Sequence, residues 1–139
     1  MNVTLTHIAL HVKDIDACVA FYQDYAGLKV VRDRQTHDNH VYWLAEPGKE
    51  TEFIMVIMPG GSGRNQPESD LSHLGFAVSS KAEVDAIAKR AEKDSILVWE
   101  PRQEAYPGGY YCGVRDPDGN FVEFSYGQPL GPGAEPDEF

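Results

Sequence analysis

The sequence has little cysteine and no long apolar run. Cys18 and Cys112 are the only two cysteines among 139 residues, too few for a disulfide framework and without the spacing of a metal-binding motif. No apolar segment approaches the roughly 20 residues that a membrane-spanning helix needs, and the first residues lack the charged and apolar regions of a signal peptide. We therefore expect a cytoplasmic protein.

Positive charge is also scarce. Twelve Lys and Arg residues stand against 22 Asp and Glu residues, which gives a formal net charge of −10. Nucleic acids and anionic membranes attract basic surfaces, so this balance argues against both as partners and leaves a small-molecule substrate. Part of the acidity lies in residues 127–139, a Pro- and Gly-rich stretch that we predict to be a flexible tail.

The first half of the chain shows the alternation of β-strands around one helical segment. In residues 5–12 the alternation puts His7, Ala9 and His11 on one face of a strand. The pattern predicts, after that strand, a helix that follows Asp14 or Asp16, runs to about Tyr25 and ends at Gly27, and then strands at residues 28–34, 40–45 and 52–58.

The second half restarts this pattern after a Gly/Pro-rich linker at residues 59–69. Residues 72–78 match residues 6–12, with His73 at the place of His7 and an offset of 66 residues. The same order follows: a helix opened by a capping box of Ser80 and Glu83, strands at 96–100, 110–115 and 121–126, and a loop at 101–109. Each half is β-α-β-β-β, so the fold class is α+β: one domain over residues 1–126 with modules at 4–58 and 70–126.

The last predicted strand carries a carboxylate among apolar residues. Asp-Pro-Asp-Gly at residues 116–119 has the composition of a tight turn, and the strand after it places Phe121, Glu123 and Ser125 on one face. A carboxylate buried in such a strand is costly unless it is paired or binds a metal. The alternative is an exposed Glu123 on an edge strand.

His7, His73 and Glu123 together indicate a metal site. Two imidazoles at equivalent places of a repeat, with one carboxylate, make the facial triad that suits Fe(II) and also accepts Mn, Co, Ni or Zn. The triad leaves coordination positions open for a substrate. For each histidine taken alone, a hydrogen-bonded core residue is the alternative.

Three segments resemble the vicinal oxygen chelate superfamily, which includes glyoxalase I, extradiol dioxygenases, and fosfomycin- and bleomycin-resistance proteins. They are Thr-His-Ile-Ala-Leu-His-Val at 6–12, Phe21-Tyr22 with Gly27-Leu28, and Asp-Pro-Asp-Gly-Asn-Phe-Val-Glu at 116–123. The resemblance covers residues 4–126. It implies two βαβββ modules that form a cupped mixed sheet with the helices outside, a homodimer, and a metal that binds two neighbouring oxygens of a substrate.

By this resemblance His7, His73 and Glu123 occupy three of the family's four ligand positions. Alignment of residues 53–56 with residues 121–124 places Met55 at the fourth, where glyoxalase I has a glutamate. Methionine is soft and neutral and replaces a carboxylate poorly. We therefore expect a three-ligand site, as in extradiol dioxygenases.

Extradiol enzymes usually add a tyrosine and a histidine for proton transfer. Tyr110 or Tyr111 could supply the tyrosine. The alternative, that both simply belong to a half-buried strand face, is at least equally favoured. His11, His37 and His40 are candidates for the histidine. In a fosfomycin-resistance-like transferase, Arg115 or Lys29 could hold a phosphonate.

The sequence therefore favours a metal-dependent enzyme of the glyoxalase/dioxygenase type, with Fe(II) as the expected ion. The alternatives are a metal-free protein of the bleomycin-resistance type that sequesters a ligand, and the fosfomycin-resistance-like transferase.

Overall fold

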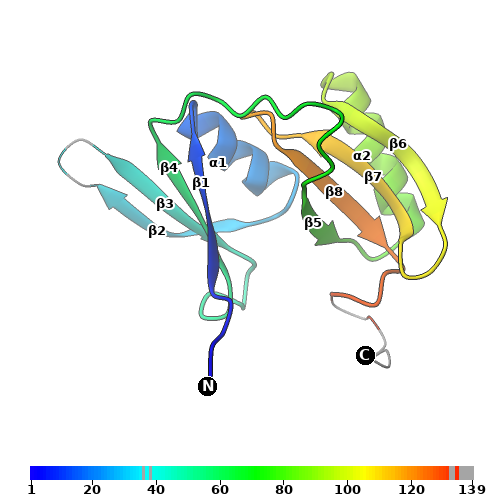
Figure 1. Ribbon diagram of the computed structural model, residues 1–139, viewed down its shortest axis with the longest axis horizontal. Coiled ribbons are helices and arrows are strands. Elements are labelled where there is room, and N and C mark those ends of the chain that lie inside the picture. Colours follow the sequence, from blue (N-terminus) through cyan, green and yellow to red (C-terminus); the bar gives the residue numbers. More distant parts are fainter. Residues whose placement is uncertain (36, 38, 132–133, 135–139) are drawn as a thin grey trace. The chain divides into compact units, whose positions relative to one another are not determined.

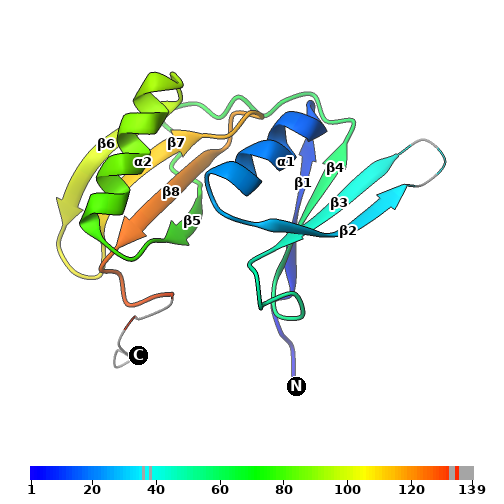
Figure 2. The ribbon, with the colours of Figure 1, turned by 180° about the vertical axis from the view of Figure 1, so that it is seen from behind.

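The computed structural model describes residues 1–35, 37, 39–131 and 134, and it divides the chain into two compact units, Met1–Asn65 and Gln66–Phe139 (Figures 1 and 2). The boundary falls inside the predicted linker at 59–69. Of the predicted flexible tail, residues 132–133 and 135–139 lie outside the described residues. None of the described helices has both the length and the apolar character needed to cross a membrane.

The N-terminal unit is one helix and a four-stranded mixed sheet. Its sheet order is β1-β4-β3-β2, with β1 parallel to β4 and the other pairs antiparallel. The elements are β1 (His7–Val12), α1 (Ile15–Asp24), β2 (Lys29–Gln35), β3 (His40–Ala45) and β4 (Ile54–Pro59).

Helix α1 begins at the first of its two predicted caps. The Asp14 carboxylate accepts a hydrogen bond from the Ala17 backbone N–H at 3.1 Å, while Asp16 lies in the first turn, where an acidic side chain favours the helix dipole. Gly27, just past the helix, has a φ of +67°, the left-handed conformation expected of it. The buried side of α1, made by Cys18, Val19, Phe21 and Tyr22, packs against β4.

The C-terminal unit repeats this architecture. Its sheet order is β5-β8-β7-β6, again with the first pair parallel and the others antiparallel. The elements are β5 (Leu74–Ala77), α2 (Lys81–Lys93), β6 (Leu97–Glu104), β7 (Gly109–Arg115) and β8 (Phe121–Tyr126). The predicted α+β fold of two βαβββ modules is thus confirmed.

Helix α2 has the predicted cap with a small difference. Ser80 Oγ accepts from the Glu83 backbone N–H at 3.2 Å, and the Glu83 carboxylate also accepts from the backbone N–H of Ser79 at 2.6 Å, one residue before the cap. The helix packs on β6, β7 and β8, where the Cys112 thiol lies 3.8 Å from the Val84 carbonyl oxygen. This contact marks the side of the sheet that carries Cys112 as the helix-facing side.

In each unit we call the sheet surface opposite the helix the open face. In the N-terminal unit, Val12, Leu44 and Met55 are buried on the helix side, and the exposed residues His7 and His11 lie on the open face. Strand pleating puts alternate residues on opposite faces, so the open face of the C-terminal unit carries the odd-numbered residues of β7 and β8. Glu123 is therefore on an open face.

One predicted loop is partly a strand. Strand β6 runs through Pro101 to Glu104, so the prediction of a loop at 101–109 was wrong over residues 101–104. The pairing with β7 shifts register between Trp99 and Arg102. An edge strand tolerates proline at such an irregularity, because no ladder hydrogen bond has to be donated there.

The predicted tight turn before β8 is present. The Gly119 backbone N–H donates to the Asp116 carbonyl at 3.0 Å, and Gly119 has a φ of +86°. The Asp116 carboxylate accepts from the backbone N–H groups of Asp118 and Asn120, each at 2.9 Å. This buried network fixes the start of β8, two residues before Glu123.

Candidate metal centre

His73 and Glu123 come together in the C-terminal unit. His73 is the residue before β5, and Glu123 lies in β8, paired with Gly75. His73 Nε2 is 3.8 Å from Glu123 Oε2. Glu123 is only 8% exposed, so the alternative of an exposed carboxylate on an edge strand does not hold.

The ring of His73 is oriented by its other nitrogen. Nδ1 lies 2.7 Å from the Leu71 carbonyl oxygen. A carbonyl can only accept, so Nδ1 carries the proton, and in the neutral ring Nε2 keeps a free lone pair on the side of Glu123. Backbone carbonyls hold metal-binding histidines in this way in many proteins.

The distance between the two groups fits an ion. At 3.8 Å the Nε2–Oε2 separation is too long for a hydrogen bond. A first-row divalent ion has bonds of about 2.0–2.2 Å to imidazole nitrogen and to carboxylate oxygen, so one ion can reach both atoms. The ligand angle of about 90° in an octahedral facial triad would bring the two atoms closer together than they stand here. The donor set is also the chemistry that such ions prefer.

Trp99 forms one wall of the pair. Its ring meets the His73 ring edge to face, with centroids 5.6 Å apart and an interplanar angle of 89°. It lies across Gly113, where an added Cβ would be 2.2 Å from the indole. Gly113 also pairs with Glu123, so the absence of a side chain there gives Trp99 its place on the open face.

Gln66, which the sequence did not single out, braces the pair. Its side-chain nitrogen donates to the carbonyls of Asp70 at 2.7 Å and Ser72 at 2.5 Å, and its oxygen accepts from the Phe121 backbone N–H at 3.1 Å. The residue is 1% exposed. One side-chain amide thus links the segment just before His73 to Phe121, the first residue of β8. Gln66 lies in the Gly/Pro-rich linker, where no periodic pattern marks a buried side chain.

His7, the third predicted ligand, lies in the N-terminal unit. It is the first residue of β1, exposed on the open face, and Thr6 Oγ1 lies 2.9 Å from its Nδ1. His11 is on the same face of β1. Among residues 1–35, 37, 39–131 and 134, no group of three or more His, Cys, Asp or Glu side chains gathers as a metal cluster.

The fourth ligand position was misaligned by one residue. Glu123 pairs with Gly75, two residues beyond His73, and the residue that pairs with Ala9, two residues beyond His7, is Val56. Met55 is buried on the helix side of β4. The equivalent of Glu123 is therefore Val56, not Met55. Valine has no metal-binding atom, so the fourth position still lacks a carboxylate, as expected.

The two candidate tyrosines point to opposite sides of β7. Tyr110 is on the helix side, where its hydroxyl donates to Asp85 of α2 at 2.5 Å. Tyr111 is on the open face with Glu123, and its hydroxyl donates to Glu104 at 3.1 Å. Desolvation, followed by this hydrogen bond, raises the pKa of Tyr111, so its phenol stays protonated at neutral pH.

Three of the remaining candidates, His40, Arg115 and Lys29, have partners of their own. His40 contacts Asp33 and stacks on Tyr42 with ring centroids 4.3 Å apart. Arg115 donates to the carbonyls of Gln66 at 2.8 Å and Gly119 at 3.2 Å. Lys29 forms an ion pair with Glu50 at 2.5 Å. Both cations proposed for a phosphonate therefore already make polar contacts within the fold.

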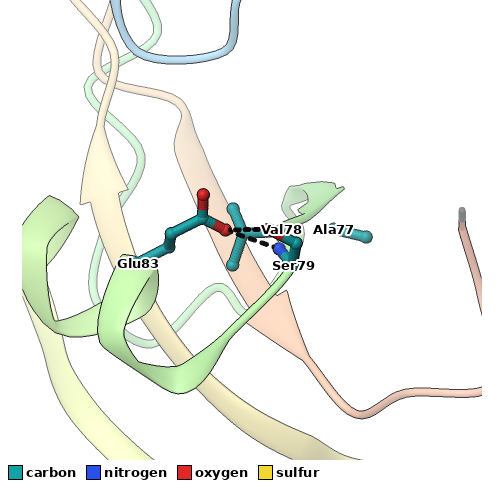
Figure 3. Close-up of a pocket in the computed structure, with 4 residues that line it drawn as sticks. All are labelled: Ala77, Val78, Ser79 and Glu83. Carbon is teal, nitrogen blue, oxygen red and sulfur yellow. Dashed lines mark hydrogen bonds between the residues drawn. The ribbon is translucent and has the colours of Figure 1, made fainter. Parts of the chain in front are cut away.

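A surface cavity of about 320 Å³ lies at the start of α2, lined by Ala77, Val78, Ser79 and Glu83 (Figure 3). The Glu83 carboxylate points at Ser79 and accepts from both its backbone N–H and its hydroxyl, at 2.6 and 2.7 Å. The polar groups that line the cavity are thus hydrogen-bonded to one another, as part of the cap of α2.

Comparison with known proteins gives the family. The model of the Glyoxalase/Bleomycin resistance protein/Dioxygenase superfamily matches residues 4–124. The chain belongs to this superfamily. The matched segment contains His7, His73 and Glu123, and the resemblance found from the sequence motifs is confirmed.

Relatives within the superfamily include an uncharacterised protein of Pseudomonas aeruginosa, 60% identical over 135 residues, which are 97% of this chain and 96% of that protein. The glutathione transferase FosA of Serratia marcescens is 23% identical over 127 residues, 89% of this chain and 81% of that protein.

Solved structures of the superfamily share the fold. The fosfomycin resistance protein FosX of Listeria monocytogenes has a TM-score of 0.71 at 23% identity, covering 92% of this chain and 96% of its own. A mutant of this FosX, solved with Mn(II) and 1S,2S-dihydroxypropylphosphonic acid, has a TM-score of 0.72 at 21% identity, covering 92% and 95%. At such identities the likeness shows the fold alone.

Proposed function

We propose that this protein is a metal-dependent enzyme of the glyoxalase/dioxygenase type, acting on a small substrate that binds the metal through two neighbouring oxygens. The observation that carries the proposal is the His73–Glu123 pair. Its nitrogen and oxygen are 3.8 Å apart, and the Leu71 carbonyl holds the imidazole in the tautomer that a metal requires.

His73, Glu123 and His7 hold the ion in this proposal. His7 comes from the same chain or from a second copy in a homodimer. Two imidazoles and one carboxylate favour Fe(II), and Mn, Ni, Co and Zn fit the same donors. The bound ion supplies a Lewis acid with open positions for the two substrate oxygens.

Tyr111 is the proton donor of the proposed site. It shares the open face with Glu123. Its raised pKa keeps the phenol protonated near pH 7, so it can donate a hydrogen bond and is a poor base. Tyr110 faces α2, so of the two predicted tyrosines Tyr111 is the better candidate. His11, on the open face of β1, is the candidate base.

Metal content tests the proposal. Protein purified anaerobically, without chelator or metal-affinity resin, is expected to contain or take up about one divalent ion per chain, and Glu123→Ala to lose it. Glu104→Ala is the matched control, since Glu104 is an exposed carboxylate that touches Tyr111 on the same sheet. A Glu123→Ala protein with full occupancy would refute the ligand assignment.

The identity of the metal selects the chemistry. Iron leads to a catechol screen with oxygen uptake, and nickel, zinc or manganese leads to isomerase and transferase assays. A protein that neither contains nor binds a divalent ion is a ligand-sequestering protein of the bleomycin-resistance type.

A fosfomycin-resistance activity is the second candidate. Likeness to the glutathione transferase FosA and to FosX, one structure of which holds Mn(II) and a phosphonic acid, favours it. The Lys29–Glu50 ion pair argues against it, because a phosphonate needs a cation whose charge is not already balanced. The carbonyls bonded to Arg115 occupy some of its donors but leave its charge unbalanced. Incubation with manganese, fosfomycin and either glutathione or water, followed by phosphorus NMR, tests this candidate directly.

A further inference from the structure

The oxygen of Glu123 that faces His73 also accepts a hydrogen bond. Gln128, two residues past the end of β8, donates from its side-chain nitrogen to Glu123 Oε2 at 3.3 Å. The same nitrogen donates to the carbonyl oxygen of Gly108 at 2.9 Å. Both contacts are to groups that can only accept, so the atom is the NH₂ of the amide and both of its hydrogens are used.

The two bonds have different consequences. Gly108 lies in the turn at 105–108 that leads into β7, and its carbonyl fixes the plane of the amide. The second hydrogen then points at the carboxylate of Glu123. The terminal torsion of a glutamate is broad and is poorly fixed by its own rotamer preference. A donor held by the backbone can set that torsion.

A neutral amide suits this task. A lysine or arginine at the same place would form an ion pair with Glu123 and compete with a metal for its charge. The amide nitrogen of Gln128 donates to Oε2 without neutralising the carboxylate, which keeps further lone pairs for an ion.

We propose that Gln128 is a positioning residue that orients the Glu123 carboxylate for metal binding, using Gly108 as its anchor. This inference rests on the proposed function, because it assigns Gln128 to the same centre. Hydrogen bonds to ligating carboxylates commonly change metal affinity about 10- to 100-fold when they are removed.

The test compares Mn²⁺ affinity in the full chain. Gln128→Met keeps most of the length and volume of the side chain and removes both donors. Gln103→Met is the matched control, because the Gln103 amide is exposed and donates to its neighbour's carbonyl, that of Glu104, at 3.2 Å. Titration followed by the EPR signal of free Mn²⁺ is expected to show about 10- to 100-fold weaker binding for Gln128→Met and no change for Gln103→Met.

The urea midpoint without metal is the second readout. Gln128 is only partly buried, so we expect the metal-free Gln128→Met protein to unfold at the wild-type midpoint. A clearly lower urea midpoint for metal-free Gln128→Met than for wild type would overturn the inference, because the weaker Mn²⁺ binding would then follow from a general loss of structure. Equal affinity of Gln128→Met and wild type would overturn it while leaving the proposed function standing. A wild-type protein that binds no ion overturns both.

Discussion

Cys112 shows how burial in the sheet changes the pKa of a single side chain. It lies in β7 and is fully buried against α2. This burial raises the pKa of its thiol to about 12 from an ordinary value of 9.0. A protonated thiol is a poor nucleophile, so Cys112 serves as a small core residue in these surroundings.

The raised pKa has a definite effect on stability. Above about pH 9 the unfolded thiol ionises while the folded thiol stays protonated. Its contribution to stability is therefore complete below pH 9 and is lost as the pH rises towards 12. We expect Cys112 to resist alkylation by iodoacetamide at pH 8 in the native protein and to react in guanidinium, as read by peptide mass spectrometry. Rapid native labelling of Cys112 would contradict this burial.

Tyr110 and Tyr111 show what the sequence leaves open at this scale. Adjacent residues in a strand must face opposite ways, so one of the two had to share a face with Glu123. The pairing of Gly113 with Glu123 decides for Tyr111, and pairing register is a tertiary property that the strand sequence alone does not contain.

Among the elements, β4 and β8 contrast most clearly. Strand β8 alternates and has Glu123 as a polar marker, so its faces were predictable. Residues 53–58 are Phe-Ile-Met-Val-Ile-Met, all apolar, which gives no period of two and no sign of which side faces the helix. The alignment of Met55 with Glu123 slipped by one residue for that reason. Cap signals are local: Ser80 located the start of α2, and the start of α1 was narrowed to Asp14 or Asp16, of which Asp14 is the cap.

The register of β4 makes a paired prediction. Val56→Glu would put a carboxylate beside His7 as Glu123 stands beside His73, and we expect Mn²⁺ affinity to rise about tenfold, equivalent to about 1.4 kcal/mol. Met55→Glu would bury an unpaired charge under α1 and is expected to lower the free energy of unfolding by about 3 kcal/mol or more. Urea unfolding and metal titration of both variants measure this. The reverse pattern would mean that Met55 is on the open face.

On the scale of the whole molecule, the repeat is what the sequence predicted best. The offset of 66 residues between His7 and His73 led to two βαβββ modules, and both are present. Whether the three proposed ligands meet could not be predicted from the repeat, because His7 belongs to the unit Met1–Asn65 and the His73–Glu123 pair to Gln66–Phe139. Gln66 and Gln128 act through contacts with backbone carbonyls that leave no pattern in the sequence.

This division allows a test of the predicted homodimer. If the partner copy supplies His7 to each proposed centre, two single variants can complement each other. His7→Ala and Glu123→Ala chains, each without metal alone, should then recover one ion per mixed dimer after co-expression, since one of its two centres has all three ligands intact. Light scattering and elemental analysis of the purified heterodimer give the answer. A mixed dimer without metal would mean that each chain supplies its own His7.

His73, Glu123, Gln66 and Gln128 all lie in one unit. Glu123 lies 3.8 Å from His73 and accepts a hydrogen bond from Gln128, while Gln66 contacts the Ser72 carbonyl and the Phe121 N–H beside them. This part of the proposed site can therefore be inherited as one piece. If His7, His73 and Glu123 hold an ion as proposed, a recombination event that replaced the N-terminal unit would exchange His7 and the surface around it, while His73 and Glu123 kept their spacing. Lineages can therefore vary the chemistry of one half without rebuilding the other.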